Sequence, residues 1–285
     1  MAKGRISVVT FSQEWHALAR EAQLAGQQIA TGVTALGRAN QAQTGYYTQA
    51  FFGLSIGLER LGKLIVLADY AIDNSGRFLT DAELKKIGHN IATLLDTCEV
   101  LSVKYRAGKK HAERPNDTIH QGAVKTLTEF GRLSRYYDLD LIVQGKSAAL
   151  TEPIEAWWKS VVQPILSKHY SKRQQEKDKL NATALAKLIG DSSYVLHQNE
   201  EGRTIDSIEA LALRTGLTSV AQKYGRLYTL QIVRWLVFLL SDLSHIGAYE
   251  RRIEPLLGLS EPFVVFMNED NLLLSRKTWS VYPPY

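Results

Sequence analysis

The chain is poor in cysteine and has no long apolar run. Its single cysteine, Cys98, has no partner for an internal disulfide or a cysteine-rich zinc site, which is typical of a reducing compartment. The most apolar run, 235–240, is much shorter than the roughly 20 residues that a membrane-spanning helix needs. The first ten residues also contain no apolar stretch long enough for a secretory signal. We therefore predict a cytoplasmic protein with no membrane partner.

Common short enzyme signatures are missing as well. The sequence contains no HExxH, no Walker phosphate loop, no GxGxxG before a helix and no GxSxG nucleophile elbow. Residues 73–76 are similar to part of a calcium loop, but Ala71 and Ala82 stand where that loop requires carboxylates. We expect neither a metal nor a cofactor.

The composition is that of a globular protein with a hydrophobic core. Apolar residues make up 45% of the chain and charged residues 22%, values that exclude extended disorder and collagen-like folds. A capping box formed by Thr80 and Glu83 predicts the start of one helix, and Asp117 or Thr118 can cap another. Caps and apolar spacing together predict helices over 14–39, 45–72, 81–105, 118–137, 154–170, 181–189, 205–213 and 218–249.

The end of the chain has a different pattern. Two apolar runs, 262–266 and 272–274, flank the polar segment 268–271, which predicts a small terminal β-hairpin. A short strand at 6–9 could pair with it. We predict a mostly all-α fold in two parts: a helical bundle over 1–148, and a C-terminal helical region over 149–285 that ends in the hairpin and packs on the first part.

Three segments in the first half resemble the HEPN superfamily. They are GLERLGK at 57–63, KIGHN at 86–90 and RYY at 135–137, and the resemblance covers about residues 40–145. It implies an all-α bundle of four or five helices. Many members are metal-independent endoribonucleases, often bacterial toxins or antiviral defence proteins, and others bind RNA, nucleotides or protein.

The HEPN resemblance also implies a site. Catalytic members carry an arginine followed after four to six residues by a histidine, and two such sites meet across a homodimer. Histidine supplies an acid or base near neutral pH and arginine supplies a cation for phosphate. Two pairs match, Arg114 with His120 and Arg106 with His111. The first is the stronger catalytic candidate because His120 falls in the first turn of a predicted helix, where backbone N–H groups favour an anion.

Five cations lie within residues 104–114 and surround these pairs, and we call this segment the basic loop. RNA is the partner that it indicates, because cations attract a phosphate backbone. Guanidinium and phenol groups can also stack on bases. The RNA-binding candidates are Lys104, Arg106, Lys109, Lys110, His111, Arg135 and Tyr136.

An alternative stays open beside the RNA hypothesis. Pro115 follows Arg114, where catalytic HEPN members usually have a polar residue. In this interpretation His120 is an ordinary histidine at a helix start, the basic loop is a solvated surface, and the aromatic residues close a core. The protein is then a non-catalytic helical interaction module.

Overall fold

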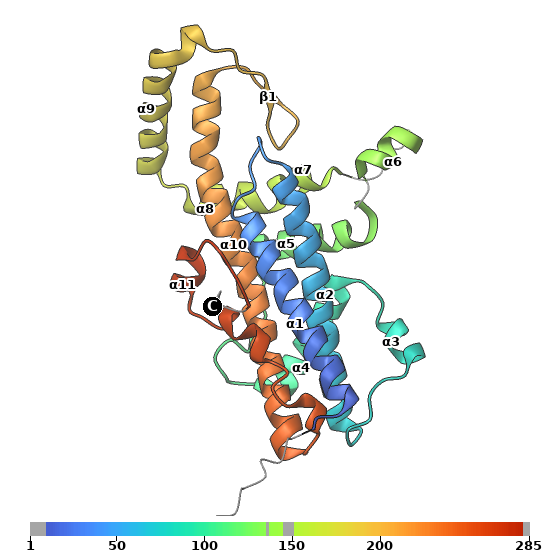
Figure 1. Ribbon diagram of the computed structural model, residues 1–285. Coiled ribbons are helices and arrows are strands. Elements are labelled where there is room, and N and C mark those ends of the chain that lie inside the picture. The colour runs from blue at the N-terminus through green and yellow to red at the C-terminus, as the bar shows by residue number, and fades with distance from the viewer. Residues whose placement is uncertain (1–9, 135–136, 145–150, 282–285) are drawn as a thin grey trace, which may run out of the picture.

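The computed structural model describes residues 10–134, 137–144 and 151–281 (Figure 1). The predicted mostly all-α fold is confirmed: helices make up most of these residues, and their one sheet has two short strands. These strands, β1 (His197–Gln198) and β2 (Thr204–Ile205), are antiparallel, with His197 opposite Ile205.

Helices α1 (Gln13–Leu36) and α2 (Gly45–Asp73) form a tightly packed antiparallel pair. Glycine makes this close approach possible. A Cβ at Gly53 would lie 2.7 Å from the Gln28 carbonyl oxygen, and one at Gly57 would lie 3.0 Å from the Ile29 backbone nitrogen. The predicted long helix at 45–72 is thus present, and its glycines face a neighbouring helix.

The predicted single helix over 81–105 is wrong, because the structure has two. Helix α3 (Asp81–Ile87) begins with the expected capping box of Thr80 and Glu83. It ends at Gly88, whose φ of +70° lies in the left-handed region that favours glycine. Asn90 then caps α4 (Ile91–Arg106) by accepting from the Thr93 N–H.

The next segment follows the prediction more closely. Asp117 caps α5 (Thr118–Glu129), which continues into the π-helical turn η1 (Phe130–Ser134). Helix α6 (Tyr137–Gln144) then projects from the bundle (Figure 1). Helix α7 (Pro153–Trp157), η2 (Trp158–Val162) and α8 (Gln163–His169) follow one another without a break.

Two long helices, α9 (Lys172–Ile189) and α10 (Ile208–His245), pack against each other. Helix α9, followed by η3 (Gly190–Ser192), packs along the first half of α10. The two helices predicted at 205–213 and 218–249 are one continuous helix, which continues into η4 (Ile246–Glu250). A Cβ at Gly216 would lie 2.5 Å from the Asp178 carboxylate, so this glycine marks a helix contact rather than a helix break.

The predicted C-terminal hairpin is wrong. The two apolar runs form the 3-10 helix η6 (Glu261–Phe266) and helix α11 (Asp270–Ser275), after η5 (Glu254–Leu256). Phe263, Phe266 and Leu273 are fully buried, so these runs pack on the other helices instead of pairing with each other. The strand predicted at 6–9 lies outside the described residues.

Helix α10 runs through the middle of the core and contacts α1, α2, α4, α5, α8, α9 and α11. The buried apolar residues of both predicted parts belong to one continuous core. The segment Ile208–Glu250 is long and apolar enough to cross a membrane, but 78% of its most apolar window is buried inside the protein. Its apolar side chains are therefore already covered by other helices.

Candidate nucleic-acid interface

The predicted basic loop is neutralised by carboxylates from neighbouring helices. Lys104 lies 2.8 Å from Asp69 and 2.7 Å from Asp73 on α2. Lys109 lies 2.9 Å from Asp242 on α10. Lys110 is paired with Glu269. These three lysines would have to give up an intramolecular partner before they could bind phosphate.

Arg106 and His111 attach the loop to α10. The buried Arg106 guanidinium lies 2.6 Å from Asp242 and donates to the backbone carbonyls of Phe238 and Lys110. The His111 ring stacks on the Phe238 ring at a centroid distance of 5.1 Å. Desolvation, aided by nearby Arg234 and Lys110, lowers the pKa of His111. This geometry favours a structural role for both residues.

His120 has a partner on each ring nitrogen. Nδ1 lies 2.8 Å from the Asp117 carboxylate, and Nε2 lies 2.9 Å from the Gln231 side-chain oxygen on α10. Burial is the main cause that lowers the His120 pKa, and Asp117 opposes it. The Asp117 carboxylate also accepts from the Ile119 and His120 N–H groups. The anion expected at this helix start is therefore the protein's own Asp117.

Arg114 lies on a different side of α5. Its guanidinium bonds to two carboxylates of α4, Asp96 at 2.7 Å and Glu99 at 3.1 Å, whereas His120 faces α10. Among the described residues no hydrogen bond or ion pair joins Arg114 to His120. The structure thus does not bring the two predicted catalytic residues together within one chain. The predicted Arg135 and Tyr136 lie outside the described residues.

Arg114 does line a surface hollow of about 370 Å³ between α4 and α5, which we call the α4–α5 hollow. Lys125 and Arg132 line it as well, and both side chains are exposed. Neither of them forms an ion pair with any described residue, in contrast to the lysines of the basic loop. The other lining residues are Asn90, Ala92, Gln121, Val124, Thr128 and Glu129.

The N-terminus of α4 opens into this hollow. Its cap, Asn90, is neutral and satisfies only the Thr93 N–H, and the first turn contains no acidic residue. The N–H groups of Ile91 and Ala92 have no acceptor within the described chain. Exposed N–H groups and the positive end of the helix dipole favour an anion. The hollow therefore combines two unpaired cations with a helix start at which the N–H groups of Ile91 and Ala92 have no partner within the described chain.

A second hollow, of about 420 Å³, has the opposite charge. It lies between the β1–β2 hairpin and α7, and among the described residues no lysine or arginine lines it. Burial raises the pKa of its Glu152, and nearby Asp138 and Glu155 add to that increase. Repulsion makes this hollow unsuitable for phosphate. Its carboxylates are Asp138, Glu152, Glu155, Glu200 and Glu201.

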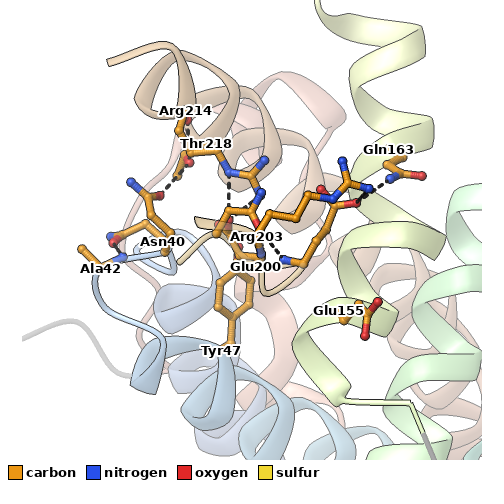
Figure 2. A network of polar contacts seen from close by, with 12 residues as sticks. Asn40, Ala42, Tyr47, Glu155, Gln163, Glu200, Arg203, Arg214 and Thr218 are labelled. Carbon is orange, nitrogen blue, oxygen red and sulfur yellow. Dashed lines mark hydrogen bonds and ion pairs between the residues drawn. The ribbon is translucent and has the colours of Figure 1, made fainter. Parts of the chain in front are cut away.

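The floor of the acidic hollow contains a polar network that the sequence did not indicate (Figure 2). Glu200 accepts from the Tyr47 hydroxyl at 3.2 Å and from Arg214 at 2.9 Å and 2.5 Å. Burial, together with the Glu200 charge, raises the pKa of Tyr47. The network fixes the β1–β2 hairpin to α2 and α10.

Lys168 and His169, at the end of α8, make polar contacts with the start of α5 and with α10. Lys168 lies 3.2 Å from Asp117, and His169 Nε2 lies 2.9 Å from the Tyr228 hydroxyl. The His169 ring stacks on Tyr224 at a centroid distance of 3.8 Å. No sequence signal placed these residues beside His120. They extend the polar contacts at the start of α5 toward α8 and α10.

Compared with known proteins, the chain matches no family model, no curated protein and no solved structure. The HEPN resemblance therefore stays a prediction. Among the described residues no group of three or more His, Cys, Asp or Glu side chains could hold a metal ion. The features that bear on function are therefore the charge and geometry of the two hollows.

Proposed function

We propose that the protein binds RNA and that the α4–α5 hollow holds a phosphate group. The observation that carries this proposal is the contrast in charge pairing. Lys125 and Arg132 have no carboxylate partner among the described residues, and they line the same hollow as the start of α4. The lysines of the basic loop are all ion-paired. Phosphate contacts supply most of the sequence-independent affinity for nucleic acid.

The remaining lining of the hollow suits a nucleotide. The Gln121 side-chain oxygen is a neutral acceptor, and Ala92 and Val124 give an apolar wall for a sugar or base. The Thr128 hydroxyl donates to the Val124 carbonyl, and the Glu129 carboxylate lowers the positive charge of the lining. Arg114 contributes a third cation, whose charge is largely balanced by Asp96 and Glu99. Phosphate therefore docks first on Lys125, Arg132 and the α4 N–H groups.

Metal-independent cleavage of RNA at a HEPN-type site is the alternative to RNA binding alone. It requires Arg114 and His120 to meet one phosphate, which in that family happens at a homodimer. In this chain the two side chains are held by different helices, and both nitrogens of His120 have partners. This observation favours binding over cleavage. The toxin or defence setting rests on the family resemblance.

The test is fluorescence anisotropy with a labelled single-stranded RNA. The variant Lys125→Gln/Arg132→Gln removes two unpaired cations, and Lys86→Gln/Lys277→Gln removes two exposed cations outside the hollow as a matched control. We expect about tenfold weaker binding for the first variant only. Its slope of log K against log salt should also fall by about 1.4, because each single-strand phosphate contact contributes about 0.7. Equal losses in both variants, or no loss in the hollow variant, would reject the site.

A further inference from the structure

Helix α9 has one face that no described residue covers. The side that packs on α10 contains Gln174, Asp178, Ala182 and Ala186, at steps of four. Six exposed residues recur at steps of three and four along the opposite face, and we call them the α9 stripe. They are Arg173, Lys177, Leu180, Ala184, Lys187 and Leu188. Figure 1 shows that α9 and the first half of α10 form an arm beyond the bundle. The stripe lies on the side of α9 away from α10.

Exposed large apolar side chains form a group on this arm, and a second such group lies on α6. Leu180 is 73% exposed and Leu188 is 79% exposed. Just beyond the helix, Tyr194 is 88% exposed and Leu196 is 67% exposed. Single exposed apolar residues are ordinary, but a cluster indicates a contact surface.

The charge of the α9 stripe has one sign. Arg173, Lys177 and Lys187 form no ion pair within the described chain, and no carboxylate belongs to the stripe. The two acidic residues of α9 lie outside the stripe: Glu176 is exposed at its edge beside Lys177, and Asp178 accepts from the Tyr170 hydroxyl at 2.9 Å. Cations next to exposed leucines suit a partner that is anionic at its surface and apolar beneath it.

The positive charge and the exposed leucines of the stripe favour one kind of partner over the others. A second copy of the arm would bring like charges together, which opposes association. RNA would satisfy the cations but would leave Leu180 and Leu188 in water. An anionic bilayer satisfies both, because leucines enter the boundary between headgroups and acyl chains while basic residues contact lipid phosphates.

We propose that the α9 stripe is a docking surface for an anionic lipid membrane. Leu180 and Leu188 enter the interface, and Arg173, Lys177 and Lys187 contact the headgroups. Tyr194 adds an amphipathic ring of the kind enriched at membrane–water boundaries. This binding is peripheral and reversible. It differs from the expectation of no membrane partner, which rested on the lack of a membrane-spanning run and a secretory signal, because peripheral binding needs neither. It is independent of RNA binding at the α4–α5 hollow.

The test is co-sedimentation of the full chain with vesicles. One set contains phosphatidylcholine only, and the other contains two parts phosphatidylcholine to one part phosphatidylglycerol. We expect binding to the anionic vesicles alone. Leu180→Ser/Leu188→Ser should lower partitioning at least tenfold, and Lys177→Gln/Lys187→Gln should lower it about 30-fold, because each cation near an anionic surface contributes about 1 kcal/mol. The control Val100→Ser/Val264→Ser changes two exposed apolar residues outside the arm and should bind like the wild type.

Several results would overturn the proposal. Absence of binding to anionic vesicles would do so, as would unchanged binding by a folded Leu180→Ser/Leu188→Ser variant. A wild-type dimer in lipid-free buffer that this variant converts to a monomer would assign the stripe to a second copy. Vesicle binding that short RNA abolishes would assign its cations to nucleic acid. Thermal unfolding of each variant verifies that the fold is intact.

Discussion

Arg214 donates two hydrogen bonds to Glu200 while its guanidinium stacks on Trp158. The donors Nε and Nη2 lie 2.9 Å and 2.5 Å from one Glu200 carboxylate oxygen. The guanidinium carbon lies 3.6 Å from the centroid of the Trp158 ring. Glu200 follows the β1 strand and Arg214 lies on α10, so this contact joins the hairpin to the central helix (Figure 2).

Removal of Arg214 should destabilise the protein strongly. The Glu200 side chain is fully buried, so Arg214→Ala leaves an uncompensated carboxylate in the core. Losing one partner of a buried pair costs about 3 to 5 kcal/mol. We expect a loss of that size in the free energy of unfolding, measured by urea denaturation. Arg214→Ala/Glu200→Gln should recover part of the loss, and a double variant no more stable than Arg214→Ala would contradict the explanation.

The contact between α1 and α2 gives a second prediction, about packing. A Cβ at Gly53 would lie 2.7 Å from the Gln28 carbonyl oxygen and 2.9 Å from Gly32 Cα, and both are backbone atoms that cannot move separately. Gly53→Ala should therefore lower the free energy of unfolding by about 1 to 3 kcal/mol, the usual cost of overpacking. Gly45→Ala is the matched control, because nothing lies within 4 Å of its added Cβ. Thermal melts of both variants test the difference, and equal melting temperatures would contradict it.

Local sequence signals predicted much of the fold. The capping box predicted at Thr80 and the cap predicted at Asp117 or Thr118 mark real helix starts, because a cap depends on residues only three positions apart. The same local rules failed at 262–274, where tertiary burial of Phe263, Phe266 and Leu273 replaced strand pairing. They failed again at Gly216, because contact with Asp178 on α9 compensates for the low helix propensity of glycine.

The candidate site was less predictable than the fold. Arg114 was singled out, and it does line the α4–α5 hollow, but Lys125 and Arg132 were missed. A signal existed, since Gln121, Lys125, Thr128 and Arg132 form a polar stripe at steps of three and four. That stripe becomes a hollow only where α4 packs beside it. The ion pairs that neutralise the basic loop are also long-range contacts that no local pattern encodes.

The histidine environments predict how stability changes with pH. Burial lowers the pKa of His120, and desolvation does the same for His111 and His169. A histidine whose pKa is lower in the folded state binds more protons when unfolded, so stability rises with pH between the folded pKa and about 6.5. The free energy of unfolding should therefore fall as the pH is lowered from 7.5 to 5. Carboxylates with ordinary pKa values of about 4 contribute little in this window. Glu152 opposes the histidines, because burial raises its pKa and it binds more protons in the folded state as the pH falls.

The variant His120→Gln measures how much of this pH-dependent loss of stability comes from His120. In His120→Gln the pH-dependent loss between pH 7.5 and 5 should be smaller than in the wild type. His197→Gln is the control, because this exposed histidine lies in the β1 strand away from α5. Urea denaturation at both pH values measures the difference. An unchanged pH dependence in His120→Gln would show that His120 does not penalise the folded state on protonation.

The geometry of Arg114 and His120 predicts the result of an RNA cleavage assay in EDTA. A general base needs a free lone pair within hydrogen-bond distance of the proton that it removes. His120 has no such free lone pair, because Nε2 is hydrogen-bonded to Gln231 and Nδ1 contacts the Asp117 carboxylate. The Arg114 guanidinium is ion-paired with Asp96 and Glu99. We expect the wild-type protein to leave total RNA and tRNA intact on a gel, as should Arg114→Ala/His120→Ala. Cleavage by the wild type alone would contradict this prediction, because it would require the two residues to leave these partners and meet at one phosphate.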